Sequence, residues 1–168
     1  LNPLAFTAYL VPTSAVTIDW AAEPELRTEH QGAAPGGITL GSTKGRSPKQ
    51  EKISGEKASE FFKFSQLTLT SKDGFILEAD VRMIIRVRPQ HASFVIARFG
   101  SVPNLIEQIV HTLIDSSFRN NAGEKKAIEF IQSRTILQKE AIEMAREEFE
   151  KYYVEAQNLL ISYIEVDV

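Results

Sequence analysis

The clearest pattern in the chain is a strict alternation of apolar and polar positions over residues 75–87 (FILEADVRMIIRV). Every odd position in this run is apolar, whereas most even positions are charged. Because successive side chains of a strand point to opposite faces of a sheet, this alternation predicts a β-strand with one buried and one solvated face. The Asp73-Gly74 step before it is typical of a hairpin turn, so we expect a long β-hairpin over residues 61–87.

The strand that leads into this turn changes phase part of the way along. Its apolar positions are even at Phe62 and Phe64 but odd at Leu67 and Leu69. A shift of one residue moves the side chains to the other face of a sheet. The change therefore predicts a bulge or a break near residues 65–66.

The N-terminal part of the chain divides into two stretches of different character. Residues 4–11 (LAFTAYLV) and 15–20 (AVTIDW) are β-favouring runs with a proline-containing turn between them, so we expect strands within residues 1–20. Residues 21–60 contain six of the nine glycines, three prolines and few apolar side chains. Such a segment buries too little apolar surface to offset its ordering entropy, so we interpret it as a polar, Gly/Pro-rich insertion between strands.

Helical periodicity begins after Pro89. Residues 90–99 end before Gly100, a residue typical of a helix C-terminus, and Ser101 is a suitable N-cap for the next helix. The apolar stripe of that next helix consists of Leu105, Ile106, Ile109, Val110, Leu113 and Ile114. We expect this helix to break at residues 119–123 (RNNAG).

The C-terminal part predicts a long helix followed by a strand. Residues 124–153 are rich in Glu, Lys, Arg and Ala, which favour helix. A strand is expected over 159–168, with one face formed by Leu160, Ile164, Val166 and Val168. Strands first and helices afterwards, with a last strand that returns to the sheet, indicate an α+β fold. We expect a single domain whose core is residues 61–168.

The long helix carries two sets of apolar positions. The larger set is Ile128, Ile131, Thr135, Ile142, Ala145, Phe149 and Tyr152. The smaller set, Phe130, Leu137 and Met144, recurs every seven residues. If one set packs on the sheet, the other can meet a partner or a second copy, so Phe130, Leu137 and Met144 are candidates for self-association. A single wide face toward the core is the alternative.

Composition excludes several classes of function. The chain has 168 residues, a net charge of −3, no cysteine and three scattered histidines. Without cysteine there is no disulfide, thiolate metal site or cysteine nucleophile. A pI near 5.7 argues against nucleic-acid binding through bulk positive charge. No apolar run is long enough to span a membrane, and the chain starts at Leu1 rather than Met, so we expect a fragment of a larger protein.

Candidate chemistry is sparse. Glu107, His111 and Asp115 lie at i, i+4 and i+8 opposite the apolar stripe, where they could hold a metal ion or form an acid–base pair. No supporting residues are evident, so we expect a solvated polar face instead. Residues 37–49 lack the Gly-Lys-Ser/Thr step of a phosphate loop. With no hydrolase, dinucleotide or metalloprotease motif either, we expect no enzyme, cofactor or metal.

A group of arginines raises the question of an anion-binding stripe. Its members are Arg82, Arg86, Arg88 and Arg98. Glu78 and Asp80 share the strand face, and no aromatic residue alternates with the arginines. We therefore expect cross-strand ion pairing or solvation rather than binding of phosphate or nucleic acid.

Three segments in this order resemble the SPFH or band 7 domain, the family of stomatins, prohibitins, flotillins and the HflK/HflC proteins. Residues 70–89 (TSKDGFILEADVRMIIRVRP) are similar to its strand, Asp-Gly turn and alternating strand. Residues 99–123 resemble its helix that leads to an Arg-containing break, and 130–168 its Ser-Arg step, helix and returning strand. Residues 8–20 fit the first strands more loosely. The insertion at 21–60 departs from the compact stomatin-type domains of the family and indicates a larger bacterial subgroup.

The resemblance implies a fold and a role. The fold is a mixed or antiparallel sheet with helices packed on one side and a C-terminal strand that returns to the sheet. The role is a non-enzymatic, membrane-associated scaffold module that homo-oligomerises and organises membrane microdomains or membrane protein complexes. It would reach the membrane through segments outside this chain and continue into a coiled coil. The alternative is a regulatory binding module for a membrane protease, with residues 21–60 as the contact.

Overall fold

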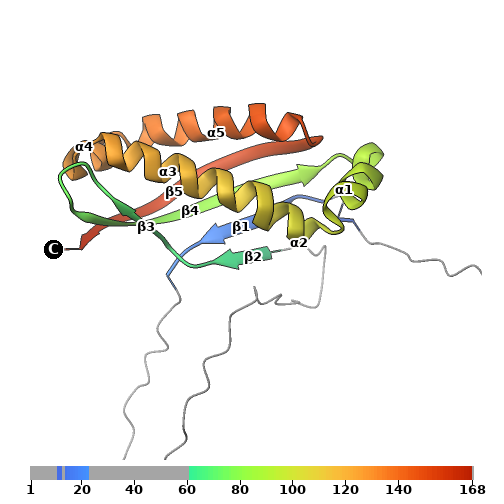
Figure 1. Ribbon diagram of the computed structural model, residues 1–168, viewed down its shortest axis with the longest axis horizontal. Helices are drawn as coiled ribbons and strands as arrows, with labels where there is room; N and C mark the ends of the chain where they lie inside the picture. Colours follow the sequence, from blue (N-terminus) through green and yellow to red (C-terminus); the bar gives the residue numbers. More distant parts are fainter. Residues whose placement is uncertain (1–10, 13, 23–60, 168) are drawn as a thin grey trace, which may run out of the picture.

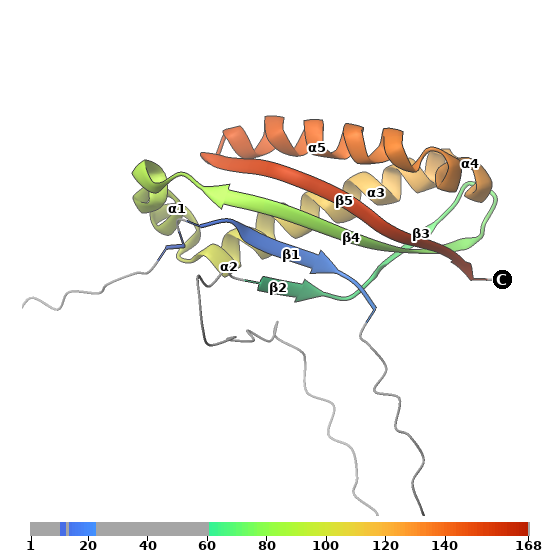
Figure 2. The ribbon, with the colours of Figure 1, turned by 180° about the vertical axis from the view of Figure 1, so that it is seen from behind.

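The computed structural model describes residues 11–12, 14–22 and 61–167, which form a five-stranded mixed sheet and a layer of helices (Figures 1 and 2). The strands are β1 (Val16–Trp20), β2 (Phe61–Phe64), β3 (Leu67–Thr70), β4 (Ile76–Val87) and β5 (Val154–Asp167). The helices are α1 (Ala92–Phe99), α2 (Val102–Leu105), α3 (Thr112–Glu124), α4 (Ala127–Gln132) and α5 (Arg134–Glu150). A 3₁₀ turn at Pro89–His91 precedes α1, and a π-helical turn at Ile106–His111 joins α2 to α3. The predicted α+β fold is confirmed.

Strand β4 is the centre of the sheet. It pairs with β5 along its whole length, and β1 and β3 lie end to end along its other edge. All of these pairs are antiparallel, whereas β2 runs parallel to β1 at the outer edge. As predicted, the odd positions of β4 from Leu77 to Val87 are buried. Phe75, just before the strand, is 45% exposed and is an exception to the predicted alternation.

The predicted break near residues 65–66 is confirmed, and the topology gives its reason. Strand β1 occupies the place beside β4 opposite residues 81–85, so the chain can pair with β4 only after β1 ends. Residues before the break therefore form β2 on the far side of β1, and residues after it form β3 on β4 itself. Of the predicted strand over 4–11, all but Val11 lies outside the described residues, as do residues 23–60 of the insertion.

The face predicted for the last strand is wrong at its N-terminal half. Strand β5 begins at Val154 rather than at residue 159, and Leu160 is 41% exposed, whereas Leu159 and Ile161 are buried. The register between β4 and β5 slips twice, at Gln157 and at Ser162, which have no partner on β4. Each bulge adds one residue, so the buried positions change from even to odd and back again.

The helix boundaries also differ from the prediction. Helix α3 continues through residues 119–123, because the Asn121 side chain donates to the Ser117 carbonyl oxygen at 3.0 Å and Ala122 is buried in the core. The predicted helix over 124–153 is divided at Ser133, whose hydroxyl donates to the carbonyl oxygens of Glu129 and Phe130. A side chain that bonds to the preceding turn in this way competes with regular helix geometry.

The helices cover one face of the sheet. Helix α3 lies in front of the strands in Figure 1 and behind them in Figure 2, and α5 runs beside β5. The core between the layers includes the fully buried side chains of Trp20, Phe130 and Phe149. The face of the sheet away from the helices, formed by the even positions of β4 and their cross-strand neighbours, is called the open face below.

Candidate functional site

Two of the three positions considered as a metal site, His111 and Asp115, serve structural contacts. The Trp20 Nε1–H donates to His111 Nδ1 at 2.7 Å, and the Phe64 ring stacks on the imidazole with centroids 4.5 Å apart. Asp115 pairs with Arg119 at 2.7 Å, one helical turn away. Over residues 11–12, 14–22 and 61–167, no three histidine or carboxylate side chains gather to hold a metal ion. The expected solvated face is correct for the exposed Glu107, but His111 is partly buried in an aromatic stack.

The expected cross-strand ion pairing is confirmed at Arg82. Its guanidinium donates twice to the Asp19 carboxylate on β1, at 2.6 and 2.8 Å. Asp19 is only 8% exposed, whereas about half of the Arg82 side chain, 49%, is exposed. The hydrogen bonds to Asp19 raise the pKa of Arg82 above its ordinary value.

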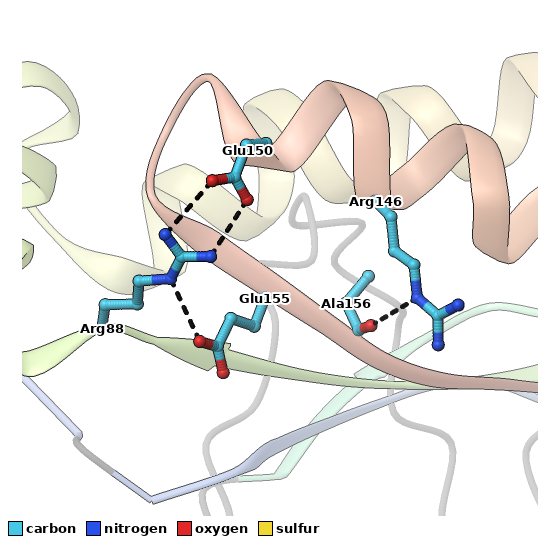
Figure 3. Close-up of polar contacts among 5 residues, drawn as sticks. All are labelled: Arg88, Arg146, Glu150, Glu155 and Ala156. Carbon is cyan, nitrogen blue, oxygen red and sulfur yellow. Dashed lines mark hydrogen bonds and ion pairs between the residues drawn. The ribbon is translucent and has the colours of Figure 1, made fainter.

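A second arginine joins three elements at one end of the molecule. Figure 3 shows the Arg88 guanidinium between Glu150, at the end of α5, and Glu155, at the start of β5. Its nitrogens lie 3.0 and 3.2 Å from the Glu150 carboxylate oxygens and 3.0 Å from Glu155 Oε1. Since Arg88 directly follows β4, these contacts hold the end of the central strand, α5 and β5 together.

Side chains of α5 bond to the backbone along the free edge of β5. Arg134 donates to the Ile161 carbonyl oxygen, and Gln138 Oε1 accepts from the Ile161 N–H at 3.2 Å. Arg146 Nε donates to the Ala156 carbonyl oxygen at 3.3 Å (Figure 3). An unpaired strand edge is a template for another strand, so α5 restricts strand addition on this side of the sheet.

The residues predicted for self-association do not form one surface. Phe130 is fully buried and Leu137 is 2% exposed, because both pack in the core of the single chain. Only Met144, at 38% exposure, lies at the surface. The prediction therefore needs correction at Phe130 and Leu137. Sequence reasoning placed Ile128 with the larger set and did not single out Ile136, yet these two are the most exposed apolar residues of α4 and α5, at 58% and 59%.

The open face carries a second group of exposed apolar side chains. Ile76, Leu160 and Tyr163 are 43%, 41% and 50% exposed. Next to them, Glu78 lies directly opposite Glu165 in the register, and Asp80 opposite Tyr163. Like charges directly opposite each other on a sheet are unfavourable. This end of the open face therefore combines apolar surface with clustered negative charge.

The Lys-Asp-Gly turn of the hairpin has a clear structural role. Asp73 Oδ1 accepts from the Ser71 hydroxyl at 2.6 Å and from the Ala127 N–H, the first of α4, at 3.0 Å. The Lys72 N–H donates to the Lys125 carbonyl oxygen at 2.9 Å. The hydrogen bond from Ser71, aided by that from Ala127, lowers the pKa of Asp73 below its ordinary value.

The comparisons with known proteins agree with this architecture. The family model described as SPFH domain / Band 7 family matches residues 2–167. Proteins of this family are generally membrane-associated scaffolds rather than enzymes. No curated protein matches the chain. None of the helices in the described part of the chain is long and apolar enough to cross a membrane. Because the family match extends over nearly all of its residues, the chain belongs to the SPFH domain / Band 7 family.

Proposed function

We propose that this domain is the non-enzymatic part of a membrane-associated scaffold that self-associates and thereby organises membrane regions or membrane protein complexes. The observation that carries the proposal is the family match over residues 2–167. A further observation supports it: the charged side chains of Asp73, Arg82 and Arg88 all take part in contacts within the fold.

Self-association through the helix layer has a specific candidate surface. Ile136 and Met144 lie at i and i+8 on α5, so both point to the same side of the helix, and both are exposed. Exposed apolar side chains on one helix face favour contact with another apolar surface. In contrast, the bonds from α5 to the edge of β5 disfavour assembly by strand addition there.

The test uses the native full-length protein. Membrane flotation and light scattering in mild detergent are expected to give a membrane-bound particle several times the mass of one chain. The Ile136→Asp/Met144→Asp variant is expected to reduce this mass, whereas Thr135→Asp, an exposed control on the same helix, is expected to leave it unchanged. A monomeric, membrane-free protein would contradict the proposal.

The alternative role as a regulatory module for a membrane protease stays a prediction. Its expected contact is residues 21–60, of which only Ala21 and Ala22 are described.

A further inference from the structure

A polar pocket lies beside the link from β2 to β3, at the start of α3. It has a volume of about 230 Å³ and is lined by residues 65–68, His111, Asp115 and Arg119. The three helical residues are spaced four apart, so they share one side of the helix. One water molecule takes up about 30 Å³ of liquid volume, so the pocket has room for a group of several heavy atoms.

The contact with Trp20 determines which nitrogen of His111 carries a proton. His111 Nδ1 accepts the indole N–H at 2.7 Å, so the proton of the neutral ring is on Nε2. Within the described part of the chain, Nε2 has no hydrogen-bond partner, and it is not one of the buried polar atoms that lack one. It is therefore open to solvent. His111 offers the pocket an N–H donor and no lone pair for a metal ion.

The Arg119 guanidinium is held by one nitrogen and has two left over. Its Nε–H donates to Asp115 Oδ2 at 2.7 Å, one turn back along α3. Its two terminal nitrogens have no partner among the residues that the structure describes, and the side chain is 57% exposed. Asp115 thus orients the guanidinium, whose terminal N–H groups stay available for a ligand.

These donors suit the oxygens of a phosphate group. Guanidinium N–H groups match phosphate oxygens in geometry and charge, and a neutral histidine adds a further directed donor. The charge of Asp115 offsets that of Arg119, so the pocket would select an anion through its donors rather than through net charge. His111 also ends the π-helical turn at Ile106–His111, and such turns within helices are frequent at functional sites.

We propose that this pocket binds a phosphate group, with His111 Nε2–H and the terminal N–H groups of Arg119 donating to its oxygens. Asp115 is a positioning residue that orients Arg119. The phosphate can belong to a soluble ligand or to a lipid headgroup, which present the same chemistry. The inference goes beyond the proposed function, because it concerns a ligand site within one domain and holds whatever the assembly state.

The only tryptophan of the 168-residue chain gives a direct readout. Consecutive hydrogen bonds polarise one another, so an anion on His111 Nε2–H makes Nδ1 a stronger acceptor for Trp20. The chain is titrated with inorganic phosphate or glycerol 3-phosphate at neutral pH, with chloride holding the ionic strength constant. The single indole N–H resonance is expected to move to higher frequency and to saturate. No saturable shift with either compound would overturn the proposal.

Variants test the role of the guanidinium. Arg119→Gln is expected to weaken phosphate binding at least about tenfold, because it removes charge-assisted hydrogen bonds. Lys139→Gln removes the same charge from an exposed position of α5 and is expected to bind like wild type. Asp115→Asn/Arg119→Gln restores the net charge of the pocket without the guanidinium, so it is expected to bind as weakly as Arg119→Gln. Wild-type affinity in either Arg119 variant would overturn the proposal.

Sedimentation with vesicles distinguishes the two sources of phosphate. The vesicles consist of phosphatidylcholine with or without phosphatidic acid, whose headgroup is a phosphate monoester. Binding to the phosphatidic acid vesicles that Arg119→Gln abolishes would assign the phosphate to a lipid headgroup. Binding that is absent, or that does not depend on Arg119, would assign it to a soluble ligand. The assembly mass of the full-length protein is measured separately, so this proposal and the proposed function fail independently.

Discussion

Single residues at the hairpin tip hold the sheet to the helix layer. The first N–H groups of a helix have no partner within the helix, and the Asp73 carboxylate accepts the N–H of Ala127 at the start of α4. Gly74 at φ +87° supplies the left-handed turn that places Asp73 there. The Asp-Gly pair noticed in the sequence as a turn signal is thus also a contact between layers.

The stability contributed by Asp73 is expected to depend on pH. Its folded pKa lies below the ordinary value of 3.8, so the contribution is fully present above that value and is lost as the pH falls through the folded pKa. Asp73→Asn is therefore expected to lower the urea midpoint at neutral pH, with a difference from wild type that shrinks as the pH is lowered below 3.8. Glu143→Gln, on the exposed face of α5, is the control. A difference in urea midpoint that is the same at neutral and at acid pH would refute the pH-dependent contribution of Asp73.

Because Phe130 and Leu137 are buried and Met144 is exposed, truncating the first two to alanine is expected to destabilise the fold more than truncating Met144. Phe130→Ala is expected to lower the free energy of unfolding by about 3–5 kcal/mol and Leu137→Ala by about 2–5 kcal/mol, because both leave cavities in the core. Met144→Ala is expected to change it by no more than about 0.5 kcal/mol, since its side chain is at the surface. Urea denaturation measures all three. A Met144→Ala cost equal to that of Leu137→Ala would contradict the burial.

At the scale of elements, the sequence predicts those features that depend only on residues close together in the chain. The alternation in β4 and the caps at Gly100 and Ser101 were predicted because each follows from neighbouring residues. The buried face of β5 could not be predicted from the sequence, because only the pairing with β4 identifies Gln157 and Ser162 as bulges.

Two other features depend on distant contacts. The unfavourable helix propensities at 119–123 are overcome by tertiary packing of Ala122. The contact of His111 with Trp20 spans 91 positions, which no local motif indicates.

The bulge at Gln157 in β5 is expected to need an extra residue at this position, whatever its side chain. Gln157→Ala is expected to cost no more than about 0.5 kcal/mol, because the side chain is exposed. Deletion of Gln157 is expected to cost at least about 2 kcal/mol, because it moves the buried Val154 and Ala156 to the other face. Chemical denaturation compares the two variants. A deletion as mild as the substitution would exclude the bulge.

The contact of α5 with the edge of β5 makes a local prediction. In Gln138→Ala, the Ile161 N–H loses its acceptor, so its hydrogen exchange is expected to accelerate by about tenfold, given a net worth of about 0.5–1.5 kcal/mol for a hydrogen bond. Lys139→Ala, an exposed neighbour on α5, is the control and is expected to leave this amide unchanged. Unaltered exchange of Ile161 in Gln138→Ala would show that another group protects the edge.

At the scale of the whole molecule, three of the side-chain contacts between the sheet and the helix layer connect residues more than 50 positions apart in the sequence. Asp73 reaches α4, Arg88 reaches the end of α5, and Trp20 of β1 reaches His111 before α3. Because these contacts connect residues far apart in the sequence, the two layers are expected to unfold together. Trp20 is the only tryptophan and is fully buried, so its fluorescence reports on this joint transition.

The contact between Trp20 and His111 is expected to stabilise the fold mainly because His111 Nδ1 accepts the hydrogen bond from Trp20. His111→Phe keeps a ring in the stack but leaves the buried Trp20 N–H without a partner, which costs about 1–3 kcal/mol. His111→Gln keeps an acceptor and is expected to cost less. Unfolding followed by both Trp20 fluorescence and circular dichroism checks this. Equal losses in the two variants would mean that shape, not the hydrogen bond, is what His111 supplies.

The direction of the strands also determines how the domain would carry tension. The chain enters β1 at Val16, opposite Ile85, and leaves β5 at Asp167, opposite Ile76, so these two points lie at opposite ends of the long central strand. A pull applied between them runs along the strands and loads the hydrogen bonds of each pair in shear, all at once rather than one after another. The five residue pairs of β1 with β4 would give way before the twelve of β4 with β5. Under load, the first strand would slide out while the central hairpin with β5 stays intact.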